Sequence, residues 1–252
     1  MIDVRGMAPI GHDEAMRLQT TEFDRTVELL RTLTDEQWRA PVAECPGWDV
    51  LTMYRHVLGA SEAGASMREN VHQMRAALAH RRQHGGPLEA ALTAVQTRER
   101  ADLDAAAVLE GLATVGPRCV RGRSRVPGPA RRLVRTKVDG PVVETWALGY
   151  LIDTIYLRDL WMHRIDAARA VGREPTIDAE HDGRIVADVV AEWARRHGSP
   201  FVLTLTGPAG GTYRAGEPSE DTDPISMDAV QFCRTLSGRA EGDGLLSTVV
   251  PF

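Results

Sequence analysis

Tyr156-Leu157-Arg158-Asp159-Leu160-Trp161-Met162-His163-Arg164-Ile165-Asp166 lies late in a long apolar segment that runs from about Pro141 to Val171. The segment predicts a single helix. Asp159 and His163 are four residues apart, so a helix stacks their side chains one turn above the other on the same face. A carboxylate and an imidazole in this arrangement can bind one divalent cation, and the HExxH motif puts two ligands on a metal with the same geometry.

The spacing of Asp159 and His163 also has a plainer interpretation. An acid–histidine pair one helical turn apart is more often a surface ion pair or a small buried hydrogen bond than a metal site. The preceding Ile152, Ile155 and Tyr156 lie on nearby faces and indicate that one flank of the pair is buried. A buried carboxylate needs a partner, and a metal ion is one of few that serve.

Composition excludes several classes of protein. The chain has 252 residues, 43% of them hydrophobic, and no apolar run long enough to cross a membrane. The start, Met1-Ile2-Asp3, lacks the features of a signal peptide, so we expect a soluble cytoplasmic protein. The net charge of −5 gives no general attraction for nucleic acid. The three cysteines are far apart and form neither a disulfide framework nor a zinc knuckle.

Apolar residues at helical spacing predict helices over residues 11–33, 50–82, 88–112, 141–171 and 179–197, after a loose leader at residues 1–10. His72, His80 and His84 have no matched carboxylates and are expected in solvent. Residues 116–135 carry seven arginines among Gly and Pro and no aromatic residue, which predicts a solvated loop. A lip that attracts anionic substrates is the alternative for this segment.

The pattern becomes β-like after Gly198. Residues 201–206 and 210–214 predict a hairpin, residues 227–236 a helix, and residues 245–252 an edge strand. The boundary near residue 175 divides the chain into a helical domain, residues 1–175, and a small α+β domain, residues 176–252. The fold class is therefore mainly α with a small α+β part.

Two parts of the chain resemble a known family. Cys45-Pro46-Gly47-Trp48-Asp49-Val50 with His56, and Asp159-Leu160-Trp161-Met162-His163-Arg164-Ile165-Asp166, resemble the mycothiol-dependent maleylpyruvate isomerases. That family belongs to the DinB-like, metal-binding four-helix bundles. The segment from Phe201 to Arg239 looks like the family's small C-terminal domain. The resemblance implies a DinB-like bundle followed by that domain, and it is more specific for the superfamily than for one reaction.

The resemblance also implies a metal triad of His56, Asp159 and His163. The family's isomerases commonly have Glu where this chain has Asp159, which is one methylene shorter. Two imidazoles and one carboxylate suit zinc, with nickel, iron or manganese as alternatives, and three protein ligands leave positions open. We therefore expect a divalent metal, zinc in the first place.

Two further residues are candidates for supporting roles. Asp166 lies one turn beyond His163 and is expected either to orient that ligand or to pair with Arg164 or Arg169. The resemblance implies that Arg239 faces the active site as a catalytic residue. The alternative for Arg239 is a cation favoured at a helix C-terminus by the macrodipole.

The function that the resemblance implies is that of a metal-dependent enzyme with a low-molecular-weight thiol, mycothiol, as cosubstrate and a small electrophile as substrate. Thiolate addition, rotation and release would give isomerisation, and retention of the adduct would give S-transfer. The single lysine, Lys137, among many arginines suits an actinobacterial genome. We expect Trp48 and Trp161 in the core and no cysteine beside the ligands. A hydrolase that activates water and a non-catalytic metal- or ligand-binding protein remain alternatives.

Overall fold

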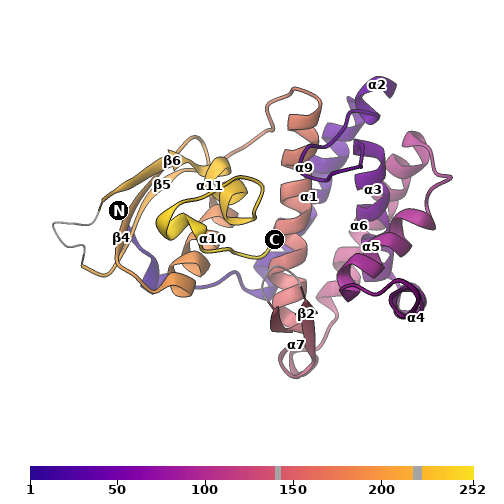
Figure 1. Cartoon of the computed structure of the whole chain (residues 1–252), viewed down its shortest axis with the longest axis horizontal. Helices are drawn as coiled ribbons and strands as arrows, with labels where there is room; N and C mark the ends of the chain where they lie inside the picture. Colours follow the sequence, from indigo (N-terminus) through magenta and orange to yellow (C-terminus); the bar gives the residue numbers. More distant parts are fainter. Residues whose placement is uncertain (140–142, 218–222) are drawn as a thin grey trace. The chain divides into compact units, whose positions relative to one another are not determined.

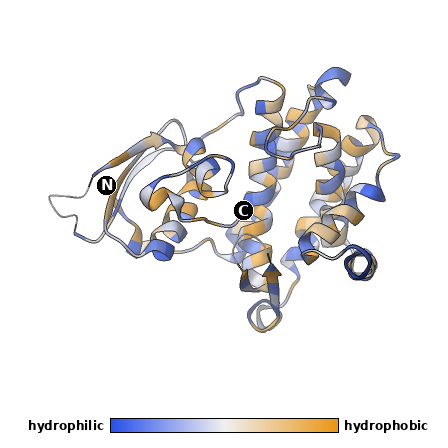
Figure 2. Cartoon of the chain, viewed as in Figure 1, coloured by the Kyte–Doolittle hydropathy of each residue, from blue (hydrophilic) through white to orange (hydrophobic). Residues whose placement is uncertain are grey.

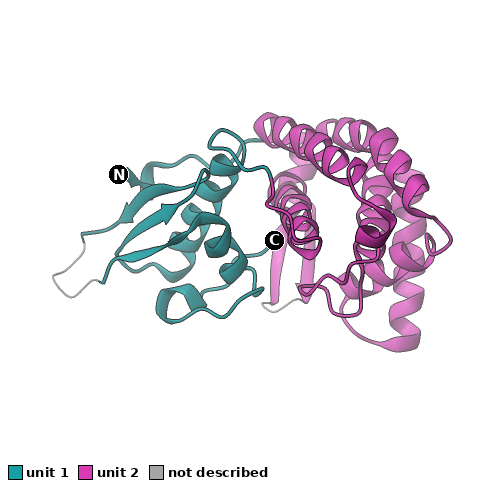
Figure 3. Ribbon diagram, turned by 90° about the horizontal axis from the view of Figure 1, so that it is seen from above, with its two compact units in different colours: residues 1–11, 176–252 teal, residues 12–175 magenta. Residues whose placement is uncertain are grey.

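The computed structural model describes residues 1–139, 143–217 and 223–252. It divides into two compact units, one of residues 12–175 and one of residues 1–11 with 176–252 (Figure 3). The first residues were expected to be a loose leader, and this expectation is wrong. Ile2–Asp3 forms the strand β1, which pairs in parallel with a strand of the second unit.

Four long helices form the core of the larger unit: α1 (His12–Arg31), α3 (Val50–Ala65), α6 (Ala105–Ser124) and α9 (Tyr156–Ala170) (Figure 1). Helices α6 and α9 each pack against both α1 and α3, so the four close into a bundle. Each helix carries hydrophobic and hydrophilic stretches, as amphipathic helices do (Figure 2). The expected mainly α fold class is confirmed. The fully buried core side chains include Leu30, Met53, Leu58, Leu112, Leu157 and Trp161.

Helices α3 and α6 touch through their backbones. A Cβ atom built on Gly122 would lie 2.2 Å from the carbonyl oxygen of Gly64, and one on Gly64 would lie 2.5 Å from Sγ of Cys119. No side chain fits in so small a gap, because the interior of a protein is close-packed. Glycine at these two positions therefore sets how closely the two helices approach.

Shorter elements surround the bundle. Several of them fall within segments where the sequence predicted fewer and longer helices: α2 (Asp35–Trp38), α4 (Met67–His84), α5 (Leu88–Arg98), α7 (Gly128–Leu133), β2 (Arg135–Asp139) and β3 (Val143–Ala147). The helix predicted over residues 50–82 is interrupted at Ser66, whose extended backbone ends α3 and whose Oγ accepts a hydrogen bond from the Glu69 N–H as the N-cap of α4. The helix predicted over residues 88–112 is likewise two helices, α5 and α6.

The arginine-rich segment is not the predicted loop. Residues 116–124 belong to α6, and most of the rest belong to α7. The buried residues Val108, Leu112, Val115 and Cys119 recur at helical spacing and hold α6 in the core. Pro117 removes one helical hydrogen bond, but burial of this face outweighs that loss.

The predicted long helix before Val171 begins later than expected. Its helical part comprises α8 (Leu148–Tyr150), the π-helix η2 (Leu151–Ile155) and α9. Val143–Ala147 instead pairs with β2 as an antiparallel hairpin. The predicted start at Pro141 lies outside the described residues.

The smaller unit is a four-stranded sheet in the order β1-β5-β4-β6, with helices on one face (Figure 1). Strands β4 (Phe201–Thr206) and β5 (Gly211–Ala215) form the predicted antiparallel hairpin. Strand β6 (Ile225–Asp228) lies parallel to β4. The helices α10 (Asp182–His197) and α11 (Ala229–Leu236) pack together, and the Trp193 ring stands edge-on to Phe201 and Phe232 at 4.8 and 5.3 Å.

Two details of the smaller unit differ from the sequence-based expectations. The helix predicted over residues 227–236 starts at Ala229, because residues 225–228 pair as β6. The segment predicted as an edge strand contains instead a short 3₁₀ turn, Gly244–Ser247, followed by irregular chain. None of the helices in the described part of the chain combines the length and the apolar character that a membrane crossing requires.

Candidate metal centre

A tight turn before α3 positions the first candidate ligand, His56. The Trp48 N–H donates to the Cys45 carbonyl at 3.0 Å, and Gly47 has φ +84°, a conformation that favours glycine. Asp49 then caps α3, and its Oδ1 accepts from the Thr52 N–H at 2.7 Å. The turn thus fixes where α3 begins, and His56 lies about two helical turns further on.

The three predicted ligands converge inside the bundle. Nε2 of His163 lies 3.3 Å from Oδ1 of Asp159, and the rings of His56 and His163 meet edge to face at 5.8 Å. One donor atom from each residue lies within 4.8 Å of the others. The Tyr54 hydroxyl donates to the His163 carbonyl at 3.4 Å and so ties α3 to α9 at the site.

The two imidazoles have different protonation behaviour. Burial lowers the pKa of His163, but the carboxylates of Asp159 and Asp166 outweigh it and raise this pKa to about 9. Burial also lowers the pKa of His56, and the charge of Asp159 does not compensate for it there. At neutral pH the metal-free site therefore holds a cationic His163 beside a neutral His56.

Each imidazole has a polar neighbour on its other nitrogen. Nδ1 of His56 lies 2.8 Å from Oε1 of Gln96, a buried residue of α5. Nδ1 of His163 lies 3.8 Å from Oδ2 of the fully buried Asp166. No sequence motif indicates Gln96, because only the packing of α5 against α3 brings it to His56.

The two arginines that are alternative partners of Asp166 also contact carboxylates on other segments. Arg164 donates to Glu22 of α1, and both side chains of this ion pair are buried. Nε of Arg169 lies 3.7 Å from Oε1 of Glu44. Asp166 faces His163, and its orienting role stays a prediction.

A cysteine lies beside the site, contrary to expectation. The thiol of Cys45 has its Sγ within 4.8 Å of donor atoms of His163 and Asp166. Cys119 and Cys233 are buried elsewhere. Trp161 is in the core as expected, but Trp48 is only half-buried, and its ring centroid is 5.7 Å from that of His56. The Cys-Pro-Gly-Trp turn thus contributes two side chains to the surroundings of the candidate ligands.

The donor set fits a divalent cation such as zinc. Two imidazole nitrogens and a carboxylate from two helices are a common catalytic zinc set, in which three protein ligands leave a position open. The His56 side chain uses Nδ1 for Gln96, which leaves Nε2 for a cation. The Asp159 side chain is 35% exposed, so the site is open to solvent on its side.

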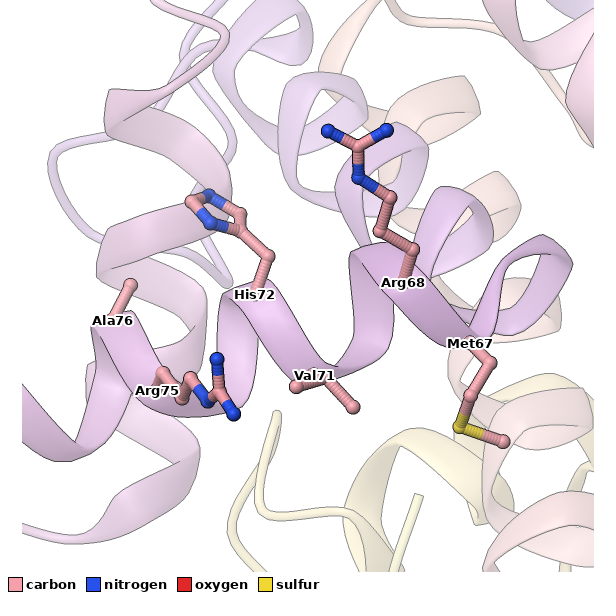
Figure 4. Close-up of a pocket in the computed structure, with 6 residues that line it drawn as sticks. All are labelled: Met67, Arg68, Val71, His72, Arg75 and Ala76. Atoms are coloured by element: carbon pink, nitrogen blue, oxygen red, sulfur yellow. The ribbon is translucent and has the colours of Figure 1, made fainter.

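A second group of possible ligands lies on the surface. His72 was expected to have no carboxylate partner, but its Nε2 lies 3.0 Å from Oε2 of Glu99, and Glu69 completes a cluster with them. His72 also borders a surface hollow (Figure 4). The hollow is lined only by residues of α4: Met67, Arg68, Val71, His72, Arg75 and Ala76. Because one helix forms its lining and none of His56, Asp159 and His163 takes part, we assign the hollow no role in the chemistry.

Arg239 belongs to the smaller unit. It follows α11, is half-buried, and its N–H donates to the Arg234 carbonyl at 2.9 Å. This position fits the alternative of a residue at a helix C-terminus. Its predicted catalytic role stays a prediction.

Comparisons with known proteins add an independent line of observation. A family profile described as the mycothiol maleylpyruvate isomerase N-terminal domain matches residues 20–168, more than half of the chain. Two crystal structures are also similar, those of the mycothiol-dependent maleylpyruvate isomerase and of its histidine-to-alanine mutant. Their identities are 16% and 15%, each with a TM-score of 0.57 and coverage of 95% of this chain and 93% of the other. A comparison with curated proteins finds no match. The structural likeness shows the expected DinB-like fold.

Proposed function

Because the chain belongs to the family of the mycothiol maleylpyruvate isomerase N-terminal domain, we propose that it is a metal-dependent enzyme with mycothiol as cosubstrate. Its reaction would be isomerisation or S-transfer on a small electrophile. The observation that carries the proposal is the convergence of His56, Asp159 and His163, whose donor atoms lie within 4.8 Å of one another in the matched segment.

In this proposal His56, Asp159 and His163 hold a divalent cation, zinc in the first place. When bound, the ion supplies positive charge that lowers the pKa of a thiol in the site. Asp159 would provide the carboxylate, and its 35% exposed side chain would leave the cation accessible to cosubstrates from solvent. Asp166, whose Oδ2 lies 3.8 Å from Nδ1 of His163, would hold that ring in place.

In the proposed reaction, covalent bonds form and break only in the thiol and the electrophile. The thiol loses its proton, and its sulfur forms a bond to one carbon of an activated double bond. The electrons of that double bond move to the activating group, and the remaining single bond rotates. Breakage of the C–S bond restores the double bond with the other geometry and regenerates the thiol. Protonation without C–S breakage retains the adduct and completes S-transfer.

The first experiment is the metal content of the purified full chain. We expect near-stoichiometric metal in the wild type and loss of it in His163→Ala. His72→Ala is the matched control, because His72 is a histidine in the separate surface cluster with Glu69 and Glu99. A wild type that stays empty after added zinc, or metal lost only in His72→Ala, would contradict the proposal.

The role of the thiol needs a second experiment. Cobalt in place of zinc gives an absorption spectrum that reports its ligands, and we expect addition of the thiol to change that spectrum. A hydrolase that activates water would show turnover without thiol and no such spectral change. A pure binding protein would hold the metal and show turnover under neither condition.

A further inference from the structure

A chain of side-chain amides leads from the candidate site into the layer formed by α4 and α5. Nδ1 of His56 contacts Oε1 of Gln96 at 2.8 Å, and Nε2 of Gln96 donates to Oε1 of Gln73 at 3.0 Å. Nε2 of Gln73 donates to the Gly59 carbonyl at 2.8 Å and to Oε1 of Glu69 at 2.9 Å. Gln96 and Gln73 are buried, at 6% and 1% exposure. Loss of any of these hydrogen bonds would leave a buried polar group without a partner, which is costly.

The far end of this chain fixes the orientation of both amides. A backbone carbonyl only accepts hydrogen bonds, so the nitrogen of Gln73 must face Gly59. Oε1 of Gln73 then faces Gln96 and accepts from its nitrogen. Oε1 of Gln96 in turn faces His56, where it also only accepts, so Nδ1 of His56 must carry the proton.

Glu69 fixes the same end of the chain a second time. Burial raises the pKa of Glu69, but hydrogen bonds from Gln73 and Arg100 outweigh it, and the pKa lies below its ordinary value. The ionised carboxylate is an acceptor only, so it takes the second N–H of the Gln73 amide. Arg100 also donates from Nη1 to the backbone carbonyl of Gln96 at 3.1 Å, and its Nη2 lies 3.1 Å from Oε1 of Glu69. It therefore contacts both Gln96 and Glu69.

Gly59 provides the space as well as the acceptor. A Cβ atom at this position would lie 2.8 Å from Cβ and 2.9 Å from Cγ of Gln96. These atoms form the stem of the side chain and cannot move aside without displacing the amide. The close approach of Gln96 to α3 therefore depends on glycine at position 59.

We propose that Gln96, oriented by Gln73 and Gly59, is a positioning residue that holds the proton of the neutral His56 ring on Nδ1. Nε2 then presents its lone pair to the cation in a fixed direction, before any cation arrives. The inference rests on the proposed metal role of His56. The position of the proton is measured in the metal-free protein. A wrong inference about Gln96 can therefore be distinguished from a wrong proposed function.

The test is a long-range ¹H–¹⁵N correlation spectrum of the metal-free full chain with ¹⁵N-labelled histidine, which reports which ring nitrogen is protonated. The His56 signals are identified by their loss in His56→Gln. We expect the wild type to carry the proton on Nδ1. Gln96→Leu should move it wholly or partly to Nε2, because Nδ1 then loses the Gln96 acceptor, whereas the Asp159 carboxylate lies in the same site. Gln96→Glu keeps an acceptor of the same shape and should keep Nδ1 protonated.

Gln19→Leu is the matched control for loss of a buried amide. Gln19 is fully buried and bonded to the Ile152 carbonyl and Arg123, away from His56. We expect it to leave the His56 proton on Nδ1. The zinc affinity should fall about 10- to 100-fold in Gln96→Leu, as is typical when a partner of a metal ligand is removed.

A wild-type His56 with its proton on Nε2 would overturn the proposal. So would a Gln96→Leu chain that keeps the proton on Nδ1 and binds zinc as the wild type does. If Gln96→Leu does not fold, the wild type and Gln96→Glu still test the proposal. Both must have a protonated Nδ1 on His56, and an unprotonated Nδ1 in either would overturn it.

Discussion

Oδ1 of Asp159 and Nε2 of His163 lie 3.3 Å apart, one turn from each other on the same face of α9. In the metal-free protein this contact stabilises the imidazolium form of His163. A cation in the site needs the same nitrogen without its proton. Proton and metal ion thus compete for Nε2, and pH has opposite effects on the empty and the loaded protein.

For the metal-free protein we expect the stabilising contribution of His163 to decrease as the pH rises. The folded-state pKa of about 9 lies above the ordinary value of 6.5. The contribution is therefore fully present below pH 6.5 and is lost as the pH rises through about 9. Urea unfolding of the wild type and His163→Gln, at about pH 6 and about pH 10, checks the sign. The wild type should have the higher free energy of unfolding at about pH 6, and its advantage over His163→Gln should be smaller at about pH 10. An advantage that stays constant or grows would contradict the prediction.

For metal binding we expect the reverse. Zinc affinity should increase with pH up to about 9, because binding displaces the proton of His163. Calorimetric titration at pH 7 in two buffers of different ionisation enthalpy measures the protons released, and we expect roughly one. Asp166→Asn removes one of the carboxylates that raise this pKa and should shift the pH dependence downward. Zinc uptake without proton release would sink this prediction.

The carboxylate of Asp159 should be required as a ligand, whereas its length should matter less. Asp159→Asn should weaken zinc binding by more than about 100-fold, the upper end for loss of a partner that only orients a ligand. Asp159→Glu keeps a carboxylate on a side chain one methylene longer and should keep the metal. Competition with a chelator of known affinity measures both. Equal zinc binding by Asp159→Asn and the wild type would remove Asp159 from the ligand set.

Cys45 offers a second possible nucleophile, because its Sγ lies within 4.8 Å of a nitrogen of His163. If the thiol is a cosubstrate as proposed, Cys45→Ala should keep metal binding and should still need added thiol for turnover. Cys119→Ala is a control at a buried cysteine near α3. Turnover by the wild type without any thiol, lost in Cys45→Ala, would assign the nucleophile to the chain instead.

The contact between α3 and α6 predicts a large loss of stability in Gly122→Ala. Alanine is favoured over glycine in a helix by about 1 kcal/mol. The new Cβ atom would however lie 2.2 Å from the Gly64 carbonyl, and overpacking of this kind costs about 1–3 kcal/mol or more. Gly111→Ala is the control on the same helix, because its Cβ atom would meet only the end of the flexible Leu58 side chain at 3.0 Å. Thermal unfolding measures the stability of both variants, and Gly122→Ala should unfold at the lower temperature. Equal stability of the two variants would contradict the prediction.

The sequence predicted those parts of the site that lie in short motifs. Asp159 and His163 share one helix face by spacing alone, and the resemblance of the turn around Trp48 added His56. Gln96 and Cys45 could not be predicted as neighbours of the site. Gln96 is a single amide in an alanine-rich segment, and only the packing of α5 on α3 brings it next to His56.

The fold was predictable in class and less so in its boundaries. Helices α1 and α9 and the β4–β5 hairpin have clear periodicity. The segment around Pro117 was misread, because local breakers and exposed arginines concealed a face that only the bundle buries. The hairpin of β2 and β3 and the break at Ser66 depend on pairing and capping, which have weak local signals.

The pairing of Ile2 with Tyr213 has a consequence for synthesis on the ribosome. The edge strand β1 is translated before the bundle segment, and its partner strand only after it. During that interval the bundle can already collapse, because residues 12–175 are contiguous. The pairing of β1 with β5 can therefore form only once Tyr213 has been translated, when the bundle segment is already complete.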